Sequence, residues 1–311
     1  MLTITHTHEA GTIIEGTSRG DGTAPILKDQ RWRWGRSIGA WYRPNSRDHR
    51  PDHLRIRATV AALEAAGFAV TQELDESVRP TAEVEAGKLA RQAARVDALD
   101  AKADRKRDDA DAAWDRHMQH VAVLPEGGEP IKVGHHSESR HRNAINRAHT
   151  SARRGIDAAN EAERAAERAN AAAHTTAARY SPQTVHNRIE KINADIRRIG
   201  RNIEGPVYDK EVGYVPATPE QKQRRAEHVA PRLEELRDRL AYWESVRATQ
   251  IDEGTATDYR PEQITKGDAV KVRGEWLQVV RVNPKTVSVE TAYSWTDKVE
   301  YAAIEDHRRA E

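Results

Sequence analysis

The composition of the chain is typical of an elongated, helix-rich protein. Of its 311 residues, 32% are charged and 37% hydrophobic, and it contains one Phe, two Met and no Cys. The formal net charge of +1 excludes a uniformly basic surface of the kind that general nucleic-acid binders carry. The lack of cysteine excludes disulfides, thiol nucleophiles and cysteine-based zinc sites.

A membrane partner is not expected. No apolar run approaches the roughly 20 residues that a membrane span requires. The N-terminal sequence "MLTITHTHEAG" lacks the basic segment followed by an apolar one that marks a signal peptide. We therefore expect a cytoplasmic protein.

Residues 1–78 predict a small α+β domain, which we call the head. It holds three of the seven tryptophans and the only phenylalanine, enough large rings to nucleate a core. The order β-α-β-β-α-β favours helices on one face of an antiparallel or mixed sheet. The predicted elements are a strand at 11–17, a helix at 21–30, two short strands within 31–44, a helix at 50–67 with apolar Leu54, Ile56, Val60 and Leu63, and a strand at 68–74.

Residues 79–255 predict long antiparallel helical hairpins in a coiled-coil-like bundle. An amphipathic helix of about 40 residues follows Pro80, and prolines and glycines at 125–134 break it. An alanine-rich helix then runs from about Ser137 to Arg179, and its small residues let two helices approach closely.

Two further helices are predicted by apolar stripes at Val185–Ile203 and Leu233–Val246, with a small β-hairpin or a loose cap at 206–219 between them. Two hairpins in series and one four-helix bundle fit this pattern equally well. The stripes could also form a homodimer or bind a partner protein.

Residues 260–311 predict an SH3-like small β-barrel, which we call the tail. The segment alternates β-branched residues over about five short strands, with turns at Gly267–Asp268 and Asn283–Pro284. The candidates for nucleic-acid contact in the tail are Lys271, Arg273, Arg281 and Lys285. Surface charge around a buried tryptophan explains these basic residues equally well.

The central region resembles the actinobacterial family known as domain of unknown function 3560. The resemblance rests on "PIKVGHHSESRHR" (130–142), the alanine-rich helix after it, and "LAYWESVRATQ" (240–250). Residues 16–48 and 266–290 resemble the modules that accompany this domain. The resemblance implies a setting in actinobacterial genomes, plasmids or phages, and it implies no activity.

The motif "GHHSESRHR" allows three interpretations. It could be the bend of a hairpin, with Ser137 as the N-cap and Glu138 paired to Arg142. It could bind an anion or phosphate, because donors gather at a helix N-terminus, or it could be a metal or catalytic site with Glu138 as general base. The adjacent histidines lack the HxxxH spacing of helical metal sites, so we predict no metal. The candidate residues are His135, His136, Ser137, Glu138, Arg140 and Arg142.

The best candidate for a nucleic-acid-binding segment in this sequence lies in the head. Arg31, Arg33, Arg36, Arg43 and Arg47 interleave with Trp32, Trp34, Trp41 and Tyr42. On one strand, alternation would place Trp32 and Trp34 on one face and the arginines on the other. The tryptophans would then form a core or, as the second interpretation, a stacking surface for bases.

Taken together, the sequence predicts an α+β multidomain, mainly α-helical, non-enzymatic protein. Its terminal modules would bind DNA, RNA or a partner protein, with the helical body as a spacer. The alternatives are an enzyme or ligand-binding protein centred on "GHHSESRHR", and a purely structural assembly protein. The sequence identifies no cofactor.

Overall fold

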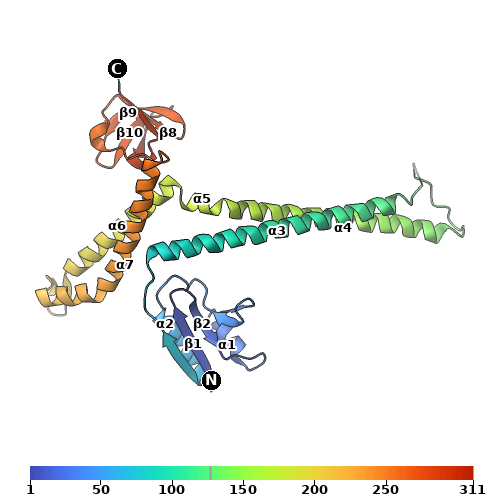
Figure 1. Cartoon of the computed structure of the whole chain (residues 1–311), viewed down its shortest axis with the longest axis horizontal. Helices are drawn as coiled ribbons and strands as arrows, with labels where there is room; N and C mark the ends of the chain where they lie inside the picture. Colours follow the sequence, from blue (N-terminus) through green and yellow to red (C-terminus); the bar gives the residue numbers. More distant parts are fainter. Residues whose placement is uncertain (126–127, 311) are drawn as a thin grey trace. The chain divides into compact units, whose positions relative to one another are not determined.

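The computed structural model describes residues 1–125 and 128–310. The chain is mainly α-helical (Figure 1). It divides into two compact units, one formed by Met1–Ala86 with Val185–Glu311 and the other by Gly87–Thr184. Part of the predicted break at 125–134 and the last residue of the predicted barrel lie outside the described residues. No helix in the described ranges has both the length and the hydropathy of a membrane span.

The head contains a five-stranded mixed sheet. Its strand order is β3-β4-β2-β1-β5, with β1 parallel to β5 and the other neighbours antiparallel. The interior strand β1, which lies between β2 and β5, is absent from the element order predicted from the sequence. The elements are β1 (Leu2–Thr7), β2 (Gly11–Glu15), α1 (Thr23–Asp29), β3 (Arg33–Gly35), β4 (Ala40–Tyr42), α2 (His53–Ala65) and β5 (Val70–Leu74).

Both helices of the head cover the same face of its sheet. Ile4 and Ile14 form one buried cluster with Leu27 of α1 and Leu63 of α2. Leu54 was predicted to join this stripe but is exposed. It lies two residues before the buried Ile56, about 200° around the helix, so it faces solvent.

Residues 87–184 form an antiparallel pair of long helices, as predicted. The pair consists of α3 (Thr81–Val121) and α4 (Glu138–Ala173), followed by the short α5 (Thr175–Arg179). The two helices lie side by side (Figure 1). Contacts run in opposite chain directions: Gln92 Nε2 donates to Ala172 O at 2.8 Å, and His117 Nδ1 lies 3.2 Å from Ser151 Oγ.

The seam between α3 and α4 consists almost entirely of small residues. Its buried positions lie three, four, seven or ten residues apart, so they share one face of each helix along its length. At Gly155 an added Cβ would lie 3.1 Å from the Trp114 ring, so this site keeps the helices close. The buried seam residues are Ala103, Ala110, Ala113, Ala148, Ser151, Gly155, Ala165, Ala169 and Ala172.

A second helical pair belongs to the other unit. It consists of α6 (Pro182–Glu204) and α7 (Pro219–Asp252), and the predicted hairpin between them is formed by β6 (Val207–Asp209) and β7 (Gly213–Val215). Helix α7 begins well before the predicted apolar stripe, because Thr218 and Gln221 form a reciprocal capping box.

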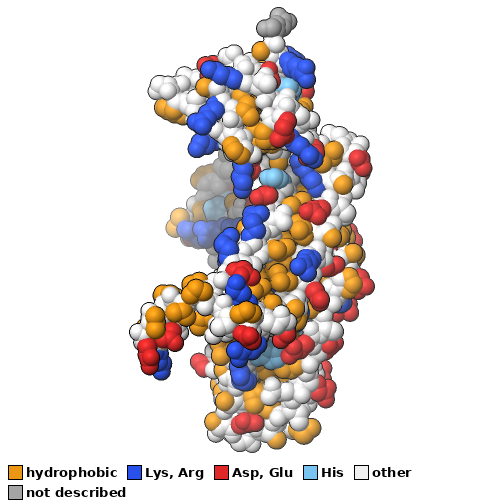
Figure 2. Space-filling view, turned by 90° about the vertical axis from the view of Figure 1, so that its left-hand side faces the viewer, with side chains coloured by type: hydrophobic (Ala, Val, Ile, Leu, Met, Phe, Trp, Pro, Cys, Tyr) orange, Lys and Arg blue, Asp and Glu red, His pale blue; other side chains and the backbone are white. Residues whose placement is uncertain are grey.

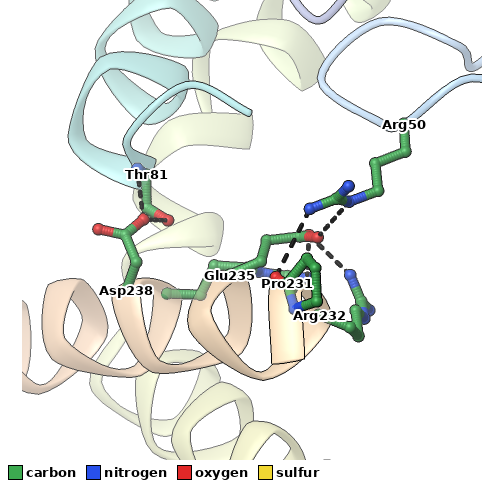
Figure 3. A network of polar contacts seen from close by, with 7 residues as sticks. Arg50, Thr81, Pro231, Arg232, Glu235 and Asp238 are labelled. Atoms are coloured by element: carbon green, nitrogen blue, oxygen red, sulfur yellow. Dashed lines mark hydrogen bonds and ion pairs between the residues drawn. The ribbon is translucent and has the colours of Figure 1, made fainter. Parts of the chain in front are cut away.

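The head and the start of α3 contact α7 through polar groups (Figure 3). Asp238 Oδ2 accepts hydrogen bonds from Thr81 N at 2.8 Å and Thr81 Oγ1 at 2.6 Å. Arg50 lies 3.5 Å from Glu235 and from the carbonyl oxygen of Pro231. Asp238 therefore caps the N-terminus of α3 from another helix.

The tail is a five-stranded antiparallel sheet of order β11-β10-β9-β8-β12. The first half of β9 pairs with β8 and the second half with β10. In the described residues β11 and β12 do not pair, so the sheet does not close into the predicted barrel; all three residues of β12 already pair with β8. The strands are β8 (Ala269–Val272), β9 (Glu275–Val282), β10 (Thr286–Glu290), β11 (Thr296–Glu300) and β12 (Asp306–Arg308).

Buried Asp268 holds the end of the chain against the tail sheet. Its carboxylate accepts from Thr265 N at 2.8 Å and Ala310 N at 2.9 Å, and lies 2.8 Å from His307 Nε2. Burial acts to raise the pKa of Asp268, but these hydrogen bonds outweigh burial and hold the pKa well below its usual range. The ionised carboxylate thus stabilises β12.

Candidate functional site

The motif "GHHSESRHR" forms the loop before α4 and its first turn. The His135 and His136 rings pack with their centroids 4.0 Å apart, and both side chains are exposed. Ser137 occupies the N-cap position, but its hydroxyl binds no amide of the first turn. It lies instead 2.7 Å from His135 Nδ1. The predicted capping bond is therefore wrong, because the neighbouring imidazole takes this hydroxyl.

Glu138 is held in a structural role. Its Oε2 accepts from Gly134 N at 2.6 Å, and its Oε1 accepts from Arg142 Nε at 2.9 Å, which confirms the predicted pair. The Gly134 amide, followed by Arg142, lowers the pKa of Glu138. A lowered pKa weakens this carboxylate as a general base. The described residues contain no group of three His, Cys, Asp or Glu side chains arranged to hold a metal ion.

Helix geometry separates the two arginines of the motif. Arg140 begins a line of residues that recur every three or four positions along α4 and therefore share one face. All five members are exposed, and from first to last they span about 21 Å of helix. We call this line the α4 stripe: Arg140, Asn143, Arg147, Thr150 and Arg154.

A shallow groove of about 510 Å³ follows most of this stripe. We call it the polar groove. Its lining offers guanidinium, amide, hydroxyl and imidazole groups, all able to donate hydrogen bonds. The lining residues are His120 of α3 and Asn143, Asn146, Arg147, Thr150, Ser151 and Arg154 of α4.

Ser151, the buried member of the polar groove's lining, is held by contacts with Ala148 and His117. Ser151 Oγ donates to Ala148 O at 2.9 Å. Since a hydroxyl has a single proton, Ser151 must accept from His117 Nδ1, which lies 3.2 Å away. Both side chains are thereby held in one orientation.

Charge is distributed unevenly along α4. Residues 138–156 contain five Arg and one Glu, a formal charge of +4 (5 − 1). Residues 157–173 contain two Arg and four acidic residues, a formal charge of −2 (2 − 4). On the face drawn in Figure 2, by contrast, basic and acidic side chains intermingle. The overall charge of +1 thus conceals a local basic segment at the polar groove.

Arg147 and Arg154 are available for an external partner. Across the described ranges neither guanidinium forms an ion pair with an acidic side chain. Both side chains are exposed. An anion that approached the groove would therefore meet two unneutralised charges one heptad apart.

The structure separates the predicted head arginines: Arg31, Arg33 and Arg36 lie at or beside the edge strand β3, whereas Arg47 lies beside the start of β2. Arg31, Arg33, Arg36 and Arg47 are exposed. Arg43 is different, because its Nη1 donates to Gln30 O at 2.9 Å and so caps the end of α1.

The predicted pairing of Trp32 and Trp34 on one strand face is wrong. Arg31 has a left-handed φ of 61°, which turns the chain before β3 begins. Trp32 is buried and donates from Nε1 to Thr59 Oγ1 at 3.0 Å. Trp34 is exposed, and its ring packs edge to face on Trp41 with the ring centroids 5.8 Å apart. Trp32 and Trp41 thus form core, and Trp34 alone stays accessible beside the arginines.

The predicted tail residues are scattered over its sheet. Lys271 is half-buried on β8, opposite Trp276. Arg273, Arg281 and Lys285 are exposed, and they come from a turn, from β9 and from the β9–β10 turn. The Trp276 ring is covered by Arg308, whose guanidinium carbon lies 4.0 Å from the ring centroid.

Two histidines in the head are buried. His6 Nδ1 lies 2.8 Å from Thr12 Oγ1, and His6 Nε2 lies 3.2 Å from His49 O. Because a carbonyl can only accept, Nε2 donates to His49. Burial lowers the pKa of both His6 and His8. These residues hold the loop that contains His49 against β1.

A comparison with protein families matches the central region of the chain. Residues 88–207 match the model described as "Domain of unknown function (DUF3560)". The chain contains a DUF3560 domain. No curated protein and no solved structure matches the chain. The DUF3560 domain includes the motif, the α4 stripe and the polar groove, whereas residues 16–48, 240–250 and 266–290 fall outside the match.

Sequence reasoning reached Arg140 but missed the rest of the α4 stripe. A signal was present, because Arg140, Arg147 and Arg154 are spaced by seven residues. A charge sum over residues 138–156 would also have revealed the basic segment. The sequence interpretation centred on His135 and His136 of the motif, and neither residue lines the polar groove.

Proposed function

We propose that the DUF3560 domain binds double-stranded DNA, with the α4 stripe against the phosphate backbone. The observation that carries this proposal is the exposed line of three arginines at heptad intervals, Arg140, Arg147 and Arg154. Seven residues of α-helix advance about 10.5 Å, so the charges recur at regular steps along a rigid rod. Arginine suits phosphate because its planar fork donates two hydrogen bonds at once.

The lining of the polar groove favours a duplex over a single strand. Proteins that hold single strands commonly stack the bases on aromatic side chains. The lining contains no Phe, Tyr or Trp. Asn143, Asn146 and Thr150 instead supply amide and hydroxyl groups, which contact phosphate and sugar in protein–DNA complexes.

The head and the tail would add secondary contacts in this proposal. Arg33 and Arg36 lie near the exposed Trp34 at the edge of the head sheet. The tail has the last strand beside the first and a 3-10 turn, Tyr301–Ala303, before it. The pairing of its first and last strands supports the SH3-like fold proposed for the tail. A DNA-binding role also fits the plasmid or phage setting that the family resemblance implies.

Titration of labelled duplex DNA with nuclease-treated protein tests the proposal. The affinity should fall as salt rises, because each phosphate contact releases bound counterions. The duplex should bind more tightly than a single strand of the same length. An absence of binding to duplex DNA at low salt would overturn the proposal, and stronger binding to duplex RNA would assign the groove to RNA.

A further inference from the structure

Large apolar side chains are exposed near the C-terminal end of α3 and near the middle of α4, which lies beside it. Trp114, Met118 and Val121 follow one another at helical spacing on α3, with 38%, 61% and 38% of their surface exposed. Ile156 of α4 is 51% exposed. The seam between the helices contains mainly alanine, so the pair keeps its largest apolar groups on the outside.

These side chains lie on one flank of the pair. Trp114 follows the seam residue Ala113 by one position, Met118 follows His117, and Ile156 follows Gly155. In an antiparallel pair the two helices rotate in opposite senses when viewed from one end. Residues one step after a seam position therefore fall on the same side of both helices. We call this side the apolar flank: Trp114, Met118, Val121, Ile145, Ala152 and Ile156.

The α4 stripe lies on the opposite flank. Arg147, Thr150 and Arg154 each precede a seam residue by one position, namely Ala148, Ser151 and Gly155. The same geometry that gathers the apolar residues on one side thus places the stripe on the other. A partner on the apolar flank would leave the polar groove open.

We propose that a second copy of this chain docks on the apolar flank. Trp114 lies beside Gly155, and His117 lies beside Ser151. These two contacts show which residues of α3 and α4 lie at the same level, that is, at the same height along the axis of the pair. Under a two-fold axis parallel to the pair, α3 of one copy faces α4 of the other at that same level. Ala152 of the second copy then lies between Trp114 and Met118.

The remaining flank residues interleave in the same way. His149, the polar member of this row, lies between the levels of Met118 and Val121, and Ile145 lies just beyond Val121. Each bulky group of α3 therefore meets a gap between side chains of α4, the packing that two helices adopt when they associate along their length. A chemically different partner would have to reproduce this spacing, whereas an identical copy has it already.

The size of the apolar flank predicts a weak dimer. From Ile145 to Ile156 it spans about 17 Å of helix. This is shorter than needed for the roughly 800 Å² per partner of a typical stable interface, so we expect a micromolar dissociation constant. The dimer would present two polar grooves on its outer sides. The proposal does not depend on DNA binding.

Crosslinking tests this arrangement cleanly because the chain contains no cysteine. The full-length Met118→Cys variant should form a covalent dimer with a flexible bis-maleimide. Gln119→Cys is the matched control, because residue 119 comes directly before His120, which lines the polar groove, and so lies on the flank of the α4 stripe. Equal crosslinking of the two variants, or none with Met118→Cys, would overturn the proposal.

Sedimentation equilibrium through the micromolar range gives an independent measurement. The wild-type chain should approach twice the monomer mass as its concentration rises. Met118→Glu should weaken association by about 100-fold, since it places a charge in the apolar contact, and Gln119→Glu should leave association unchanged. A wild-type chain that stays monomeric, or a Met118→Glu variant that associates as wild type does, would refute the second copy. Far-UV circular dichroism checks that all variants keep their helices.

Discussion

Replacing Arg147 and Arg154 together by alanine removes two of the three arginines of the α4 stripe. For duplex DNA each phosphate contact contributes about 0.9 to the slope of log affinity against log salt. Three contacts predict a slope near −2.7, and the double variant should retain about −0.9. At about 0.1 M salt each phosphate contact therefore raises the affinity about 8-fold relative to the affinity at 1 M salt. The double substitution should therefore weaken binding by about 60-fold, or roughly 2.4 kcal/mol.

Fluorescence anisotropy of a labelled duplex, titrated at several salt concentrations, measures both quantities. The substitutions should not disturb the fold, because Arg147 and Arg154 are exposed and form no ion pair among the described residues. Alanine is at least as good a helix former as arginine. Far-UV circular dichroism and thermal unfolding of the variant should thus match the wild type.

The matched control replaces Arg142 and Arg153 by alanine. It removes the same charge from the same helix, but Arg142 is paired with Glu138. Arg153 lies midway between the seam residues Ser151 and Gly155, on the outer face of α4. Screening limits the influence of such distant charges, so the control should keep a salt slope near the wild-type value. Equal loss in both double variants would show that net charge, and not the stripe, governs binding.

Three further predictions concern stability. The unfolded chain takes up protons on His6 and His8 near pH 6.5, whereas burial lowers the pKa of both in the folded head; stability should therefore fall as the pH drops below about 6.5. Thermal unfolding between pH 7.5 and 5 checks this, and the double variant His6→Gln, His8→Gln should lose that part of the pH dependence. Asp268→Ala leaves buried donors of the tail unpaired and should cost about 3 kcal/mol or more, so hydrogen exchange of the tail amides should lose its protection; retained protection would contradict the role of this carboxylate. Asp238→Ala removes the cap that Thr81 binds and should cost about 1 kcal/mol, measured as a lower urea midpoint by circular dichroism; an unchanged midpoint would mean that another group replaces the cap.

Local periodicity in the sequence was sufficient to locate most secondary structure. The stretch after Pro80 predicted a helix of about 40 residues, and α3 spans Thr81–Val121. Apolar spacing of three and four residues marks a helix whatever it packs against, because it follows from the helical repeat itself. The alternation of β-branched residues in the tail is local in the same sense and predicted its strands.

Functional residues were harder to predict, because a short motif does not show which helix face its members occupy. Arg140 and Arg142 are two positions apart, and the helix turns them to opposite flanks. Only the identity of the seam, set by Ala148 and Ser151 against α3, shows which flank is polar and which is apolar.

The sequence by itself determined where the helices and most strands lie, that two long helices approach closely through alanine, and that the basic charge is local. The tertiary structure decided the rest: the interior position of β1 in the head sheet, the burial of Trp32 without Trp34, the contact of the Ser137 hydroxyl with His135, and the line of arginines on an open groove. The physical reason is that periodicity specifies the faces of an element, whereas the partner that covers a face is chosen by contacts between residues far apart in the chain.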